Sequence, residues 1–174
     1  MTALVVYESM FGSTRAVAEA VGAGLVDADV PTRVVEVGDL AAEQAGGGLP
    51  EDVTLLVVGG PTHAFSMSRD TTRADAAKEA PGGHVISDRT GVREWIDHLR
   101  IPGRLPVATF DTKVAKPALP GSAARAAAKR LRAIGAHEVL PPHSFKVHGK
   151  ADGLLDGELD AARAWGRDLG ALSR

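Results

Sequence analysis

A hydroxyl-rich turn carries the clearest chemical signal in the sequence. It consists of Ser9, Met10, Phe11, Gly12, Ser13 and Thr14. The turn joins an apolar run to a helical pattern, and a helix N-terminus offers unpartnered backbone N–H groups and a partial positive charge. Hydroxyls add donors, and glycine lets the backbone approach an anion closely, so the turn favours a bound phosphate. It has no lysine, which argues against a nucleoside-triphosphatase loop. Plain helix capping is an equally good interpretation of the turn alone.

Two other segments are rich in glycine, hydroxyl and turn-forming residues. One covers 59–66 and contains Pro61, Thr62, His63, Ala64 and Phe65. The other covers 111–117 and begins with Asp111, Thr112 and Lys113. Each follows an apolar run that predicts a strand. Ligands of open α/β sheets bind outside the carboxyl ends of the strands, so we expect all three segments to converge on one ligand.

Alternating strand and helix patterns must position these segments. Apolar runs predict strands at 3–7, 33–37, 53–58, 105–110 and 137–140. Helical periodicity predicts helices at 14–26, 92–99, 122–134 and 155–172, and 38–50 is typical of a short helix followed by a loop. This alternation predicts an α/β fold with a parallel sheet and right-handed crossovers. Trp95 and Trp165 lie on apolar helical stripes, so we expect both in the core.

Composition limits the remaining classes of function. The chain has 174 residues, of which 44 % are hydrophobic, so we expect one domain over 1–174 with a full core. It has no cysteine, which excludes disulfides and thiolate chemistry. A formal net charge of −2 does not favour nucleic acid as a partner. No apolar run approaches the length of a membrane span and no basic leader precedes the first strand, so we expect a cytoplasmic protein without membrane insertion.

A long insertion is expected at about 66–91. Residues 71–80 predict a helix, and a turn at Pro81, Gly82 and Gly83 follows it. Connections of this length in compact domains are usually functional or disordered. The sequence leaves open a lid over the ligand, a dimer contact or a packed surface insertion.

The chain resembles the flavodoxin family over essentially its whole length. The phosphate loop of that family alternates Ser or Thr with other residues around a glycine, and Ser9, Gly12 and Thr14 match it, whereas Phe11 replaces a hydroxyl. The segments 9–12 and 61–65 also resemble a related branch, the FMN-dependent quinone reductases of the tryptophan-repressor-binding-protein type. The resemblance implies a doubly wound five-stranded parallel sheet in the order 2-1-3-4-5, with helices on both faces and FMN as cofactor.

Carried onto this sequence, the resemblance implies a set of FMN-binding residues. The phosphate would lie at Ser9, Gly12, Ser13 and Thr14, beside Met10 and Phe11. The flavin would lie between 61–65 and 111–113. Flavodoxins stack the ring between aromatic side chains of the second and third loops, but 111–117 has no aromatic residue, which leaves Phe65 and Phe11 as the expected ring contacts.

Charged and polar side chains are also expected near the ring. Arg69, Arg73, Lys113 and Lys116 would favour full reduction of the flavin there. His63 would contact the flavin, a substrate or water.

Three functions follow from the resemblance. The first is electron transfer through FMN with redox partner proteins. The second is an FMN-dependent NAD(P)H:quinone-type oxidoreductase that uses a small electron acceptor. The third is a flavodoxin-like binding module that has lost FMN. We expect no catalytic side chain, because the cofactor would supply the chemistry, and no metal site.

Overall fold

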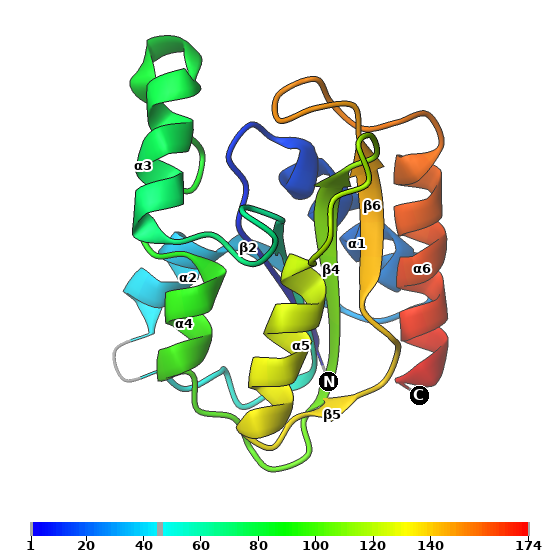
Figure 1. The fold of residues 1–174 in the computed structure, drawn as a ribbon. Helices are drawn as coiled ribbons and strands as arrows, with labels where there is room; N and C mark the ends of the chain where they lie inside the picture. Colours follow the sequence, from blue (N-terminus) through cyan, green and yellow to red (C-terminus); the bar gives the residue numbers. More distant parts are fainter. Residues whose placement is uncertain (1, 45–46, 174) are drawn as a thin grey trace.

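A parallel sheet forms the centre of the molecule, shown here as a computed structural model that describes residues 2–44 and 47–173 (Figure 1). The strands β2 (Thr32–Glu36), β1 (Thr2–Tyr7), β3 (Val53–Pro61), β4 (Pro106–Val114) and β5 (His137–Glu138) follow one another in that order. A further strand, β6 (His143–Val147), also pairs with β4. The continuous apolar runs of β1 and β3 are buried because helices cover both faces. The expected strand order and α/β fold are therefore confirmed.

The edge of the sheet differs from the expectation of one strand at 137–140. The short β5 pairs with Pro106 and Val107, and β6 pairs with β4 again from Phe110 to Val114. Pro141 and Pro142 lie in the gap between them. Proline has no backbone N–H to donate to a ladder, so the strand stops and resumes beyond the prolines. The sequence prediction missed β6 because it ended the strand at this break.

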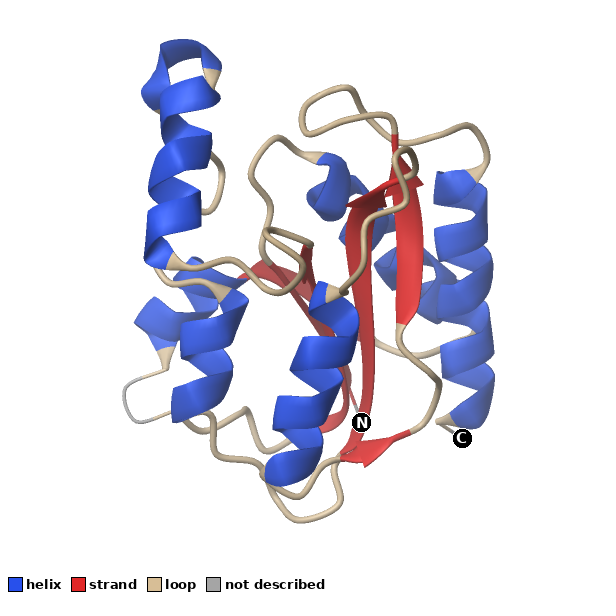
Figure 2. Cartoon of the chain, in the orientation of Figure 1, coloured by secondary structure: helices blue, strands red, loops and turns tan. Residues whose placement is uncertain are grey.

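Helices cover the two faces of the sheet (Figure 2). On one face α1 (Ser13–Asp27) and α6 (Glu158–Leu172) pack together, and Trp165 is buried beneath them. On the other face lie α2 (Val37–Glu43), α4 (Val92–His98) and α5 (Ala123–Ala133), with Trp95 in their core. Both tryptophans are thus core residues, as expected. None of the helices in the described ranges has the length and hydropathy needed to cross a bilayer.

The segment 66–91 contains α3 (Asp70–Glu79) and a 3₁₀ turn at Pro81–Gly83. The helix agrees with the expected range of 71–80 to within one residue at each end. Its axis rises beyond the carboxyl ends of the strands, at the upper left of Figure 1.

Two buried carboxylates anchor the segment 66–91. Glu8, directly after β1, accepts hydrogen bonds from the Ser68 hydroxyl and, at 2.8 Å, from the Val92 backbone N–H. Burial raises the pKa of the Glu8 carboxyl. At the end of β2, Glu36 accepts a 2.6 Å hydrogen bond from the Ser87 hydroxyl. Both ends of the segment 66–91 are therefore packed onto the sheet, which favours a packed surface insertion there. A lid over the ligand and a dimer contact stay predictions.

Candidate functional site

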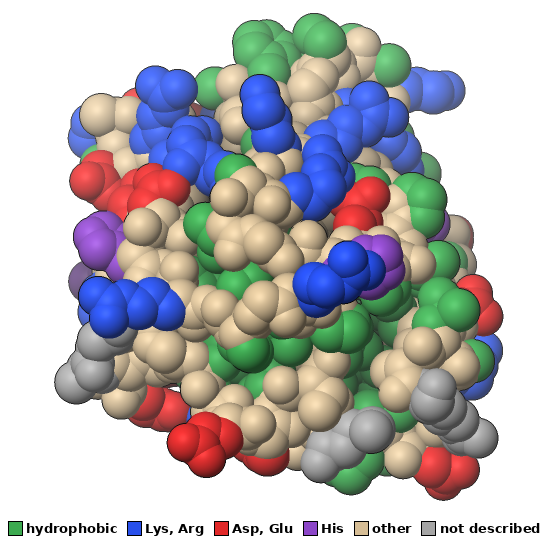
Figure 3. Space-filling view, turned by 90° about the horizontal axis from the view of Figure 1, so that it is seen from below, with side chains coloured by type: hydrophobic (Ala, Val, Ile, Leu, Met, Phe, Trp, Pro, Cys, Tyr) green, Lys and Arg blue, Asp and Glu red, His purple; other side chains and the backbone are tan. Residues whose placement is uncertain are grey.

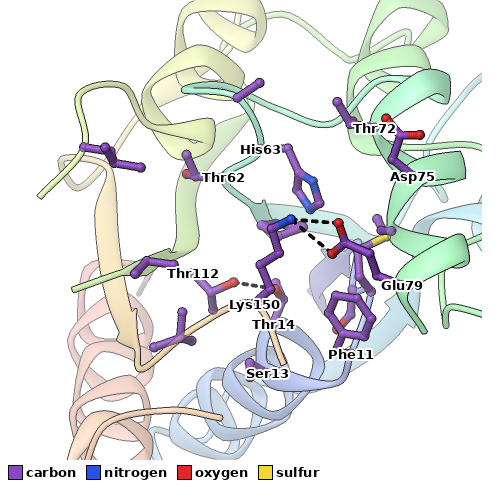
Figure 4. Close-up of a pocket in the computed structure, with 18 residues that line it drawn as sticks. Phe11, Ser13, Thr14, Thr62, His63, Thr72, Asp75, Glu79, Thr112 and Lys150 are labelled. Carbon is purple, nitrogen blue, oxygen red and sulfur yellow. Dashed lines mark hydrogen bonds and ion pairs between the residues drawn. The ribbon is translucent and has the colours of Figure 1, made fainter. Parts of the chain in front are cut away.

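A cavity of about 380 Å³ opens at the carboxyl ends of β1, β3 and β4 (Figure 4). Its walls come from the turn before α1, the loop after β3, the end of β4, helix α3 and the loop after β6. The volume lies within the range of small-molecule sites. In an open α/β sheet this is also the edge at which ligands bind.

Most of the residues predicted to bind FMN line this one cavity. They are Ser9, Met10, Phe11, Ser13, Thr14, Pro61, Thr62, His63, Ala64 and Thr112. Gly12, Phe65, Asp111 and Lys113 do not line it. The convergence of three sequence segments is thus observed, while the binding of a cofactor by these residues stays a prediction.

The turn before α1 leaves the helix N-terminus open. Gly12 precedes the helix with φ 104°, a left-handed conformation that favours glycine, and no side chain of the described residues caps the helix by a hydrogen bond. The Ser9 hydroxyl accepts a 3.1 Å hydrogen bond from the Gly12 N–H. No acidic residue lies in the first turn of the helix. The unpartnered N–H groups at the start of α1 and the nearby hydroxyls therefore suit an anion.

A pair of threonine hydroxyls forms the floor between the first and third segments. The Thr14 and Thr112 hydroxyl oxygens lie 2.6 Å apart, so each holds the other in place. Thr112 was expected in a loop, but it belongs to β4. The ladder of β4 continues because Asp111 and Thr112 pair with β3 on one side and with β6 on the other.

Asp111 points to helix α5 instead of the cavity. One of its carboxylate oxygens accepts hydrogen bonds from the Thr62 hydroxyl at 3.1 Å, the Ser122 hydroxyl at 2.5 Å and the Ala124 N–H at 3.0 Å. The Thr62 hydroxyl in turn accepts from the Ala123 N–H at 2.9 Å. These contacts join the loop after β3 to the start of α5. Asp111 thus supports the cavity wall by holding Thr62 and the start of α5 in place.

The basic side chains expected near the ring lie elsewhere. Arg73 is buried and pairs with Glu94 at 3.1 Å and with Asp70. The Lys113 ammonium donates to the Gly121 carbonyl at 2.6 Å. Arg69 and Lys116 are exposed and do not line the cavity. The expectation that these four residues tune a ring in this cavity therefore loses its geometric basis.

Lys150 is instead the basic residue in the cavity wall. Its ammonium lies 3.0 and 3.1 Å from the two carboxylate oxygens of Glu79 in α3. Figure 4 shows this ion pair beside the His63 ring, above Thr14 and Thr112. Sequence reasoning missed Lys150 because the strand before its loop, β6, was not predicted.

The imidazole ring of His63 lines the cavity. Burial, and then the charges of Lys150 and Arg73, lower the pKa of His63 below its usual value. No hydrogen bond to its ring is found within the described ranges. The backbone of His63 and Ser66 forms a tight turn with hydrogen bonds of 2.8 and 2.9 Å, and Ala64 and Phe65 between them have φ of 44° and 72°. Positive φ is unusual for such residues and marks a backbone held by its surroundings.

Apart from Val114, which lies in the predicted segment 111–117, the remaining lining residues were not predicted. Helix α3 contributes Thr72, Asp75, Ala76 and Glu79, and the strand ends and loops add Val114, Leu119, Val147 and Lys150. The length of the segment 66–91 was the one sequence signal for the α3 wall. Of the two expected ring contacts, Phe11 lines the cavity, whereas Phe65 lies outside it and its side chain is 54 % exposed.

Comparison with known proteins places this architecture. No protein-family model and no curated protein sequence matches the chain. Among solved structures, it is similar to a flavodoxin from the domain Archaea, with a TM-score of 0.68 and 20 % identity over 99 % of both chains. It is also similar to flavodoxin 1 from Bacillus cereus, with a TM-score of 0.66 and 15 % identity over 99 % of this chain and 97 % of the other.

A larger protein contains the same fold as one part. The flavodiiron protein from Giardia intestinalis has a TM-score of 0.62 and 19 % identity, and the match covers 99 % of this chain but 36 % of that one. The parallel sheet, with helices on both faces and a ligand-sized cavity at its carboxyl edge, defines a doubly wound α/β protein. More narrowly, the chain has the flavodoxin-like fold.

Proposed function

We propose that the protein binds FMN in this cavity and transfers electrons between protein partners. The observation that carries the proposal is the open N-terminus of α1, which shares one cavity with the loops after β3 and β4. The solved structures of similar fold are named flavodoxins, which supports FMN as the ligand.

The residues of the cavity fit the parts of FMN. The backbone N–H groups at the start of α1 and the hydroxyls of Ser9 and Ser13 would hold the phosphate dianion. Thr14 and Thr112 offer hydroxyls above the floor. The flat apolar ring would contact Phe11 and the aliphatic wall of Leu119 and its neighbour Val114.

The chain's own part in the reaction is binding, orientation and exclusion of water. When bound, FMN supplies the electron-accepting chemistry. The aliphatic wall at Val114 and Leu119 keeps water from one side of the cavity, and the lowered pKa of His63 favours the uncharged form of its ring there. Because Leu119 lines the cavity and is also 48 % exposed, this wall borders the solvent where a partner can approach.

The test is an FMN titration of the purified protein, followed by stepwise anaerobic reduction recorded by visible spectroscopy. We expect saturable binding and reduction in two separate one-electron steps. Riboflavin, which lacks the phosphate, should bind at least about tenfold more weakly, since one charge-assisted contact is worth about 1.5 kcal/mol or more. Equal affinity for the two ligands would contradict the phosphate site. No binding of either would leave a scaffold that has lost FMN.

A second candidate function is an FMN-dependent oxidoreductase with a small acceptor. Helix α3 favours it, because Thr72, Asp75, Ala76 and Glu79 enclose a side of the cavity that a simple electron carrier does not need. The carboxylates of Asp75 and Glu79 favour an uncharged acceptor such as a quinone. Steady turnover of NADPH with benzoquinone by the FMN-loaded protein, together with direct two-electron reduction, would support this function over the first.

A further inference from the structure

The charges of the chain are unevenly distributed. Between 112 and 137 every Asp, Glu, Lys or Arg position is basic: Lys113, Lys116, Arg125, Lys129, Arg130 and Arg132. Because the whole chain has a formal net charge of −2, the rest of it is distinctly acidic. Such segregation of charge creates a local potential that steers charged partners.

The basic residues of this stretch differ in their contacts. Arg130 and Arg132 on α5 pair with Asp97 and Glu138. Lys116, Arg125 and Lys129 are exposed and form no ion pair within the part of the chain that the structure describes. Arg125 and Lys129 are four residues apart on α5 and so share one face of the helix. Figure 3 views the molecule from below, the end opposite the cavity, and shows Lys and Arg side chains gathered along the upper edge of that view.

An exposed apolar pair lies on the loops next to the start of α5, the helix that carries Arg125 and Lys129. Phe65 and Leu119 are 54 % and 48 % exposed. The loops that carry them touch at Gly121, where a Cβ would lie 2.0 Å from the Phe65 carbonyl oxygen. Lys113 fixes this loop through its hydrogen bond to the Gly121 carbonyl. Leu119 also lines the cavity, so the apolar pair reaches the mouth of the candidate site.

We infer that this surface docks an acidic electron-carrier protein. We call it the basic rim and define it as Phe65, Leu119, Lys116, Arg125 and Lys129. The inference rests on the proposed electron-transfer function and names the partner's chemistry: an acidic surface around a small apolar centre. Interfaces combine an apolar core with a polar edge, and complementary charge mainly raises the association rate. The rim places both features next to the cavity, where electrons would leave or enter.

A protein fits the rim better than a nucleic acid does. Two large apolar side chains, Phe65 and Leu119, belong to the rim, and its three cations are Lys116, Arg125 and Lys129. Affinity for nucleic acids depends instead on many phosphate contacts. The two kinds of partner can be distinguished by experiment, because a protein-docking surface should bind an acidic protein more tightly than DNA, and a nucleic-acid site should do the reverse.

The experiment measures association with carriers of opposite charge. The probes are an acidic plant-type [2Fe–2S] ferredoxin, a basic cytochrome c and a short DNA duplex, each flowed over the immobilised FMN-loaded protein. We expect ferredoxin to associate fastest, with a rate that falls steeply between about 20 and 200 mM salt. Reversing two charges, in R125E/K129E, should slow ferredoxin association at low salt by about tenfold or more and speed that of cytochrome c.

Two further variants separate charge from packing. R100E/R104E carries the same change in net charge but alters exposed residues next to the N-terminal end of β4, and it should leave ferredoxin association within about twofold of the original. Phe65→Asn suits the φ of 72° and removes the ring, so it should speed dissociation without changing the salt dependence. Stopped-flow electron transfer with ferredoxin should follow the same order of variants.

Several results would overturn the inference. The first is that ferredoxin does not associate at low salt. The second is that R125E/K129E and R100E/R104E slow its association equally. The third is that ferredoxin binds more weakly than the DNA duplex does. Association does not require a flavin, so it is also measured on flavin-free protein. If FMN fails to bind but ferredoxin still associates through the rim, the proposed function fails and the docking surface stands.

Discussion

Ser87→Ala is the substitution that best tests how the segment 66–91 holds the candidate site. The Ser87 hydroxyl donates to Glu36 and accepts a 3.0 Å hydrogen bond from the Ser9 N–H, and all three residues are buried. Alanine leaves a buried carboxylate oxygen and a buried N–H without partners. At about 1.5 kcal/mol for each group, the free energy of unfolding should fall by about 3 kcal/mol. The ratio of folded to unfolded protein would then drop by about a hundredfold.

The assay is urea unfolding followed by circular dichroism. With a urea dependence of about 2 kcal/mol per M, the midpoint should fall by about 1.5 M at unchanged slope. Ser173→Ala is the control, because among the described residues its hydroxyl bonds the Gly170 carbonyl alone, at the end of α6, and its removal should cost less than about 0.5 kcal/mol. A midpoint shift below about 0.4 M for Ser87→Ala would refute the reasoning. Because Ser9 opens the turn that lines the cavity, the variant should also bind FMN less tightly.

Two other predictions concern the cavity itself. Gly12→Val should weaken FMN binding at least about tenfold in a fluorescence titration, since a branched residue at φ 104° carries strain of about 1–2 kcal/mol where the phosphate would approach. The circular dichroism spectrum should stay unchanged, because within the described residues a Cβ at Gly12 would meet only Ile86, at 3.9 Å. Burial lowers the pKa of His63 in the folded chain, so the unfolded chain binds a proton at a higher pH than the folded chain does. The free energy of unfolding should therefore fall as the pH drops below about 6.5. His63→Gln should lose less stability than the original protein between pH 7 and pH 5 in urea titrations, and an identical loss would contradict this assignment.

The structure also shows why the ends of the strands were harder to predict than their centres. A buried central strand is a continuous apolar run, and β1 and β3 were recognised from it. The polar residues Asp111, Thr112 and Lys113 look like a loop, yet β4 includes them because β3 and β6 both pair with this part of the chain. Pairing across strands is invisible to a local pattern. For the same reason the sequence did not predict β6, and so it did not predict that Lys150, in the loop after β6, lines the cavity.

Side-chain direction was a second limit. Asp111 and Arg73 were expected near a ring, but each is buried in a hydrogen-bond network that serves a neighbouring helix. Polar residues near a site can either contact the ligand or hold the scaffold, and residue type does not distinguish the two. Here the packing of α3 and α5 against the sheet directs Arg73 and Asp111 into the scaffold.

Local pattern alone was enough to predict the order of the elements apart from β6, the alternating α/β class and the three segments that meet at the carboxyl edge. It could do so because apolar periodicity and turn chemistry act over a few residues, and because parallel strands bring their ends to one edge. The tertiary structure decided which side chains line the cavity, how α3 encloses it and how the loop of Phe65 packs against Gly121 just before α5. Those features depend on burial and on contacts between residues far apart in the chain, such as Lys150 and Glu79, and they exist only once the chain has folded.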